Sequence, residues 1–159
     1  MPSHRAQRLL IRSVWVFLLV VNLSWAVCSG QNVAPVTGDA RVDKLLSVAR
    51  PFAGRVVLAG SSMGGHVAAA AARSLNARGL FLLAPAFYMP GFEVFTPRNV
   101  GCPAVIVHGW LDDIVPVDHS IRWAHEHRAT LHVLDSDHRL QDQLPSICQY
   151  LRAFLQSLS

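Results

Sequence analysis

A glycine-rich turn between two apolar runs constrains this sequence more than any other stretch. The turn has the sequence GSSMGG over residues 60–65, the apolar run VVLA precedes it, and the alanine-rich run VAAAAA begins at Val67. This order predicts a strand, a sharp turn and a helix, the setting in which a G-x-S-x-G pattern presents a reactive serine. Ser62 is that central serine. Gly60 and Gly64 carry no Cβ, so the backbone can turn tightly and the helix can approach the strand.

Apolar runs and helical periodicity alternate along the rest of the chain. We expect strands at 55–59, 80–84 and 103–108, the last two of them buried, and a last short strand at 131–134. We expect one helix that is capped by Asp39 or Thr37 and runs to about Arg50, and another from 63 to about 76. A third helix, capped by Asp118, should run to about Arg128, and a fourth should occupy a carboxyl-terminal stretch from about 144. This alternation predicts an α/β fold with a mostly parallel sheet flanked by helices. Such a sheet binds ligands outside the carboxyl ends of its strands.

Two polar groups join Ser62 at the carboxyl ends of predicted strands. Asp112 lies in the loop after one predicted strand, and His138 lies in the loop after the next. A serine hydroxyl needs a base within hydrogen-bond reach, and the base needs a group that orients it. The chain order serine, acid, histidine is the order expected when a nucleophile turn opens a triad. We therefore predict Ser62 as nucleophile, His138 as base and Asp112 as orienting acid, with Asp113 as the alternative acid.

The neighbours of Ser62 are predicted to line the same site. The Met63 N–H stands at the start of the predicted helix, where it can stabilise an oxyanion, and Gly64 follows it. His66 lies one helical turn after Ser62, where it either packs against the fold or edges the site. His108 is expected to support the acid loop rather than to react.

The three motifs together resemble those of the α/β-hydrolase superfamily. The turn at 60–65 matches the nucleophile elbow, the stretch HGWLDDIVP at 108–116 resembles the acid loop H-G-x-x-D-x-x-V-P, and the pair DH at 137–138 resembles the histidine loop. From about Asp39 to its end, the chain is similar to the carboxyl-terminal two thirds of a small bacterial esterase- or thioesterase-like member. The resemblance implies a minimal fold with little or no lid, and Asp112 as the triad acid. It also implies cleavage of a small-molecule carboxylic ester or thioester through an acyl-enzyme.

The sequence departs from the family pattern before Ser62. Members normally carry an H-G loop after an earlier strand, and that loop supplies a second oxyanion donor; no such motif precedes Ser62 here. If residues 14–21 take the place of that strand, the segment that begins at Asn22 replaces the H-G loop. Loss of one oxyanion donor lowers the rate by about 10²–10³-fold. The alternative function is therefore a weak or inactive hydrolase-fold remnant that acts as a binding module.

The amino-terminal residues allow two interpretations. Residues 1–12 are basic, and residues 13–31 carry no charge. A basic segment before an apolar one is typical of an export leader or a membrane anchor, and membrane association would then run through residues 14–27. An apolar run is equally typical of a buried parallel strand, which would leave the protein cytoplasmic. We divide the chain into residues 1–30, a leader, anchor or atypical first strand, and residues 31–159, the hydrolase domain.

Composition and cysteine usage argue against several other classes. The formal net charge is +4, but no basic stripe with interleaved aromatic residues occurs, so we expect no nucleic-acid binding. His125 and His127 are two residues apart on a predicted helix, which is poor spacing for a metal, and we expect neither metal nor cofactor. Cys28, Cys102 and Cys148 form no C-x-x-C pair. Cys102 and Cys148 either pair in an oxidising compartment or, in the interpretation we favour, remain buried free thiols.

Overall fold

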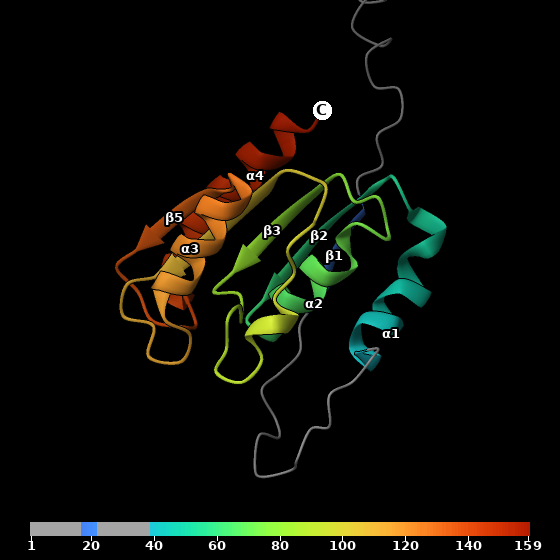
Figure 1. The fold of residues 1–159 in the computed structure, drawn as a ribbon. Helices are drawn as coiled ribbons and strands as arrows, with labels where there is room; N and C mark the ends of the chain where they lie inside the picture. The colour runs from blue at the N-terminus through green and yellow to red at the C-terminus, as the bar shows by residue number, and fades with distance from the viewer. Residues whose placement is uncertain (1–16, 22–38) are drawn as a thin grey trace, which may run out of the picture.

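The protein is built on a parallel sheet whose strands follow one another in chain order (Figure 1). The computed structural model describes residues 17–21 and 39–159, and within these ranges the sheet has five strands. The strands are β1 Phe17–Val21, β2 Val56–Ser61, β3 Gly79–Leu83, β4 Ala104–Gly109 and β5 Thr130–Leu134. Each strand pairs in parallel with the next. The predicted α/β fold is confirmed, and the carboxyl ends of the strands share one edge of the sheet.

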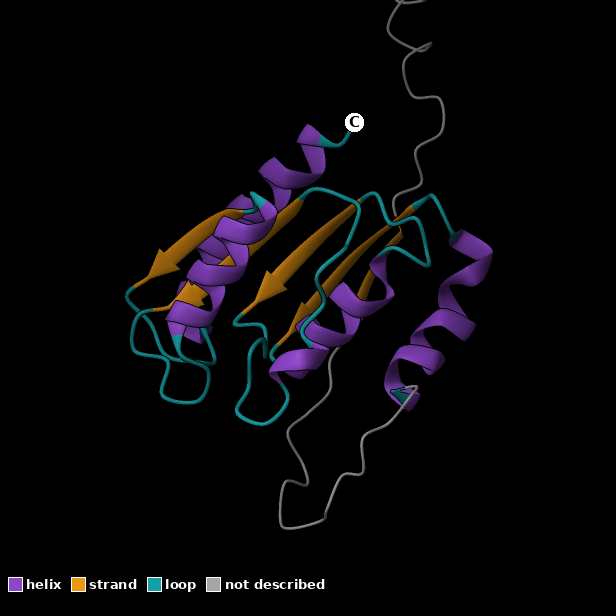
Figure 2. Cartoon of the chain, viewed as in Figure 1, coloured by secondary structure: helices purple, strands orange, loops and turns teal. Residues whose placement is uncertain are grey.

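Helices cover both faces of this sheet. The longer helices are α1 Ala40–Ala49, α2 Met63–Ala72, α3 Val117–His127 and α4 Leu144–Ser157. The short 3₁₀ helices are η2 Arg50–Phe52, η3 Glu93–Phe95 and η4 Gln141–Gln143. Figure 2 shows α2 and α3 in front of the strands, with α1 at the right beside α2. The apolar side chains of α4 pack with the opposite set of strand residues, so α4 covers the other face.

Successive residues of the central strands point to opposite faces of the sheet and pack in two separate apolar clusters. Leu58, Leu80 and Ile106 pack in the larger cluster, together with the side chains of α1, α2 and α3. Val57 and Val107 pack in the smaller cluster with the side chains of α4. The central strands are therefore apolar on both faces, which is why their sequences read as continuous apolar runs rather than alternating ones.

Two helix boundaries differ from the sequence-based expectation. Helix α2 ends at Ala72, and a series of turns follows to Asn76, whose φ is 45°. Asp118 was expected to cap α3, but α3 begins at Val117, with Pro116 as the preceding residue and no side-chain cap. At α1 the expectation holds, because the Asp39 side chain accepts a hydrogen bond from the Arg41 N–H.

Strand β1 lies within the apolar amino-terminal run. Its residues 17–21 pair with residues 56–60 of β2. Residues 1–16 and 22–38, which include Asn22, the division at residue 30 and most of the predicted leader, lie outside the described residues. Leader and anchor therefore remain predictions. In the described parts of the chain, no helix is both long enough and apolar enough to cross a membrane.

Candidate active site

Ser62 sits in a sharp turn between β2 and α2. Its backbone has φ 52° and ψ −120°, a combination that residues with a Cβ rarely adopt. The Ser62 N–H donates to the Leu83 carbonyl at 2.8 Å, and the Ser62 carbonyl accepts from the Ala86 N–H at 3.0 Å. A Cβ on Gly60 would overlap the backbone of Gly64, so the close approach of strand and helix needs glycine there. The turn thus holds the hydroxyl of Ser62 above the carboxyl edge of the sheet.

The three residues that the sequence predicted as a triad meet at this edge. The Nε2 atom of His138 lies 3.0 Å from the Oγ atom of Ser62. The Nδ1 atom of His138 lies 2.8 Å from the Oδ2 atom of Asp112. The Asp112 side chain is fully buried and the His138 side chain is 12% exposed. Three loops that are far apart in the chain therefore form one line of hydrogen bonds from a hydroxyl to a buried carboxylate.

Backbone and side-chain donors surround the carboxylate of Asp112. Its Oδ1 atom accepts from the N–H groups of Ile114 and Val115 at 2.9 and 2.8 Å. Burial alone would raise the pKa of Asp112, but the hydrogen bonds from Val115, His138 and Ile114 outweigh burial and hold that pKa below its usual value. The neighbouring Asp113 is exposed. The structure therefore brings Asp112, and not Asp113, to His138.

The loop that carries His138 is fixed by its own polar side chains. The Oδ1 atom of Asp137 accepts from the N–H groups of Arg139 and Leu140, at 2.8 and 3.2 Å. The Ser136 hydroxyl donates to the carboxylate of Asp142 in η4. Because these bonds hold the backbone on both sides of His138, the imidazole needs little reorganisation to face Ser62.

A second buried histidine touches the acid, and the sequence indicated only part of its role. The Nε2 atom of His108 lies 2.9 Å from the Oδ2 atom of Asp112, and both side chains are fully buried. The Nδ1 atom of His108 lies 2.7 Å from the Oγ atom of Ser120 on α3. His108 was expected to support the acid loop, and it does. Ser120 was missed, because an inward serine on a helix carries no signal in the sequence.

The aromatic loop between β3 and β4 is anchored to α3. The Tyr88 hydroxyl donates to the Glu126 carboxylate at 2.6 Å, and the Trp123 indole N–H donates to the Pro97 carbonyl at 2.8 Å. Phe87 stacks on Trp123 at a ring distance of 4.8 Å. The first aromatic residues of this loop are buried, whereas Phe92 and others further along are exposed.

The remaining predicted residues fall into three groups. Met63 and Gly64 are the first two residues of α2, so their N–H groups have no carbonyl partner within the helix. His66 is half-buried and its Nδ1 atom lies 3.2 Å from the Ala86 carbonyl, which makes it a packed residue beside the elbow. Asn22 lies outside the described residues. The described residues contain no cluster of histidine, cysteine and carboxylate side chains that could hold a metal.

The two carboxyl-terminal cysteines are free thiols. Cys102 is half-buried and Cys148 is exposed, so the expectation of free thiols holds but the expectation that both are buried is wrong. Burial raises the pKa of the Cys102 thiol to about 11, which leaves it protonated and unreactive at neutral pH.

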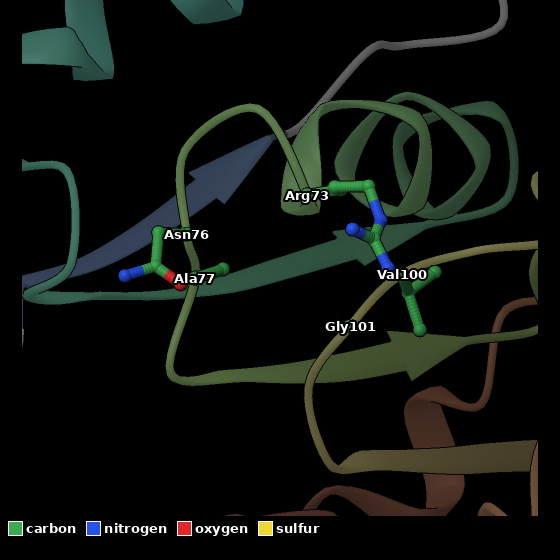
Figure 3. A pocket seen from close by; sticks show the side chains of 5 residues that line it. All are labelled: Arg73, Asn76, Ala77, Val100 and Gly101. Atoms are coloured by element: carbon green, nitrogen blue, oxygen red, sulfur yellow. The ribbon is translucent and has the colours of Figure 1, made fainter.

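A small hollow elsewhere on the surface is distinct from the triad. Figure 3 shows its lining residues, which are Arg73, Asn76, Ala77, Val100 and Gly101. Arg73 follows the last residue of α2, whereas Ser62 precedes the first. A helix of ten residues separates the two positions by about 15 Å. The hollow therefore takes no part in the arrangement around Ser62.

Solved structures with the same architecture identify the family. A protein from Xanthomonas campestris described as a hydrolase of the α/β superfamily is 34% identical, with a TM-score of 0.68 over 74% of this chain and 68% of that one. The chain belongs to the α/β-hydrolase superfamily. The predicted resemblance to small bacterial esterase-like α/β-hydrolases is thereby confirmed. The sequence itself matches no protein-family model and no curated protein.

Two further solved structures have the same fold at lower identity. A lidless serine hydrolase from Xanthomonas campestris is 25% identical, with a TM-score of 0.59 over 78% of this chain and 63% of that one. A thermophilic esterase from Thermogutta terrifontis is 17% identical, with a TM-score of 0.59 over 74% of this chain and 65% of that one, and supports the fold alone. The matches span about two thirds of these relatives' lengths. At the general level, the two relatives from Xanthomonas campestris support a hydrolase.

Proposed function

We propose that the protein is a serine hydrolase that cleaves a carboxylic ester or thioester through an acyl-enzyme intermediate. The observation that carries this proposal is the line of hydrogen bonds from the Ser62 hydroxyl through His138 to Asp112, with distances of 3.0 and 2.8 Å. A nucleophile, a base and an orienting carboxylate are the groups that acyl transfer to serine requires. Trp110 and Leu111, which are 58% and 66% exposed, add apolar surface in the loop before Asp112.

The geometry supports a two-step reaction. The Nε2 atom of His138 takes the proton from the Ser62 hydroxyl while the Oγ atom attacks the carbonyl carbon of the substrate. The tetrahedral intermediate collapses, His138 gives the proton to the departing alcohol or thiol, and the acyl group stays on Ser62. Water then repeats the sequence and releases the carboxylic acid. Asp112 accepts from the Nδ1–H of His138 throughout, which fixes the tautomer and stabilises the imidazolium.

The oxyanion of the intermediate is assigned to the start of α2. The N–H groups of Met63 and Gly64 are not used within the helix, and the positive end of the helix dipole favours negative charge there. The Met63 N–H follows the nucleophile directly, which is the usual position of one oxyanion donor in this family. Asn22 remains our candidate for the neighbourhood of the second donor.

Hydrolysis of p-nitrophenyl acetate and p-nitrophenyl butyrate by the full chain tests the proposal. We expect Ser62→Ala to lower kcat by at least about 10³-fold, since removal of one triad member leaves only the contribution of binding and oxyanion stabilisation. Ser61→Ala is the matched control, because Ser61 is exposed at the end of β2, and it should stay within about twofold of wild type. Equal rates for wild type and Ser62→Ala would remove the proposal and favour the binding-module alternative.

A further inference from the structure

The carboxylate of Asp112 is shared by two histidines. Its Oδ2 atom lies 2.8 Å from the Nδ1 atom of His138 and 2.9 Å from the Nε2 atom of His108. The side chains of Asp112 and His108 have no exposed surface. A carboxylate oxygen has two lone pairs, so one imidazole can occupy each. The other oxygen, Oδ1, accepts from two backbone N–H groups.

The partners of His108 define which of its nitrogens carries the proton. Its Nε2 atom faces two acceptors, the Asp112 carboxylate and the Val115 carbonyl, which lies 2.9 Å away. Nε2 must therefore be the protonated nitrogen. Burial lowers the pKa of His108, against the opposing effects of the Val115 carbonyl and Asp112, so the ring is neutral near pH 7. The unprotonated Nδ1 atom then accepts from the Ser120 hydroxyl at 2.7 Å.

We propose that His108 and Ser120 are positioning residues of the triad: the Ser120 hydroxyl holds the imidazole of His108 in place through Nδ1, and the His108 Nε2–H fixes the orientation of the Asp112 carboxylate. This inference rests on the proposed function. With the Nε2–H of His108 in place, one lone pair of Oδ2 is occupied and the other is directed at His138. Without it, the carboxylate can rotate about its Cβ–Cγ bond, and the hydrogen bond to His138 becomes longer or is shared with Oδ1.

The network connects three elements of the fold. His108 lies in β4, Ser120 lies in α3, and Asp112 lies in the loop that joins them. Two imidazoles and two backbone N–H groups therefore contact the acid directly, and Ser120 on the helix acts on it through His108. One continuous chain of polar contacts runs through five side chains. In order, they are those of Ser62, His138, Asp112, His108 and Ser120.

Two substitutions at His108 distinguish the effect of its hydrogen-bond donor from the effect of its side-chain volume. The side-chain amide of His108→Gln can place an N–H group near the position of Nε2, whereas His108→Leu fills the cavity without any donor. We expect His108→Leu to lower kcat by about tenfold with KM within about twofold of wild type, and His108→Gln to recover most of that loss. Ser120→Ala should give a smaller loss of about threefold, because the Val115 and Asp112 acceptors still favour the same tautomer. His132→Leu, which removes a half-buried strand histidine stacked on Tyr150, is the matched control and should keep kcat within about twofold.

Nuclear magnetic resonance of the ¹⁵N-histidine-labelled full chain tests the pairing without any substrate. We expect His108 to be a neutral Nε2–H imidazole at pH 7. We also expect the downfield proton of the His138 Nδ1–H to move upfield in folded His108→Leu and to return toward its wild-type position in His108→Gln. An Nδ1–H or cationic His108 in the wild-type protein would overturn the inference, as would an unchanged kcat and an unchanged His138 resonance in His108→Leu. If the wild type hydrolyses no ester, the proposed function fails, but the spectra still decide the pairing of His108 with Asp112.

Discussion

Ser62 holds a backbone conformation that favours its chemistry and opposes the stability of the fold. Its φ of 52° and ψ of −120° fall where a Cβ crowds the backbone, and such a residue typically destabilises a fold by about 1–3 kcal/mol. We predict that Ser62→Gly unfolds with a free energy about 1 kcal/mol higher than Ser62→Ala, since only glycine relieves the crowding. Urea denaturation of the two inactive variants measures the difference. A less stable Ser62→Gly would show that the turn is not strained by its side chain.

At the acid position, two adjacent aspartates provide a controlled comparison. Asp112 is buried against His138, whereas Asp113 is exposed. We predict that Asp112→Asn lowers kcat by about 10³–10⁴-fold, because the amide no longer selects the tautomer of His138 that can accept from Ser62. Asp113→Asn should remain within about twofold of wild type. Steady-state kinetics on one p-nitrophenyl ester compares the pair, and a larger loss for Asp113→Asn would reverse our assignment of the acid.

Between elements, the end of β4 touches the histidine loop at a position where only glycine fits. A Cβ on Gly109 would overlap the carbonyl oxygens of Ser136 and Asp137, which directly precede His138. We predict that Gly109→Ala lowers the free energy of unfolding by about 1–3 kcal/mol and displaces His138, so that kcat falls as well. Gly91→Ala is the control: Gly91 has a φ of 78° but open space around it, so it should lose about 1 kcal/mol and no activity. Chemical denaturation and esterase kinetics report both effects, and an active, equally stable Gly109→Ala would contradict the prediction.

The contact between the aromatic loop and α3 should make the free energy of unfolding depend on pH in the alkaline range. Burial and the neighbouring Glu126 raise the pKa of Tyr88 from 10.0 to about 12. Because the native state holds the phenolic proton more tightly than the unfolded state, this stabilisation is complete below pH 10 and is lost as the pH rises toward 12. We predict a shallower alkaline decline of the unfolding free energy for Tyr88→Phe than for wild type. Denaturant titrations at several pH values between 9 and 12 measure both slopes, and parallel slopes would argue against the raised pKa.

Elements built from apolar runs could be predicted from the sequence, whereas their ends depend on tertiary contacts. Strands β2 to β4 were recognised because central parallel strands are buried on both faces and read as continuous apolar runs. The end of α2 at Ala72 was not recognised, because the alanine-rich pattern continues beyond it and the turns to Asn76 are set by packing. Likewise, aspartate is a favourable capping residue, but Pro116 and not Asp118 occupies the cap position, so α3 begins two residues earlier than expected.

For the molecule as a whole, the parallel direction of the strands explains where the site lies. Because every strand is parallel to its neighbour, the loops after β2, β4 and β5 open on the same edge, and the motifs on them were expected to meet there. The contact of His108 with Asp112 was less predictable, because it depends on how residues 110–116 fold back over the end of β4. The amino-terminal interpretation is the least constrained, since an apolar run has the same appearance in a leader and in a buried strand.

Covalent labelling of the full chain with a fluorophosphonate, followed by peptide mass spectrometry, tests directly whether Ser62 is the activated nucleophile. We predict one stoichiometric adduct on Ser62 in wild type and in Ser61→Ala, and no adduct in Ser62→Ala. Labelling should also slow strongly in Asp112→Asn, because the same base activates the hydroxyl toward phosphorus and toward carbon. Equal labelling of wild type and Ser62→Ala, or an adduct on another residue, would contradict the account.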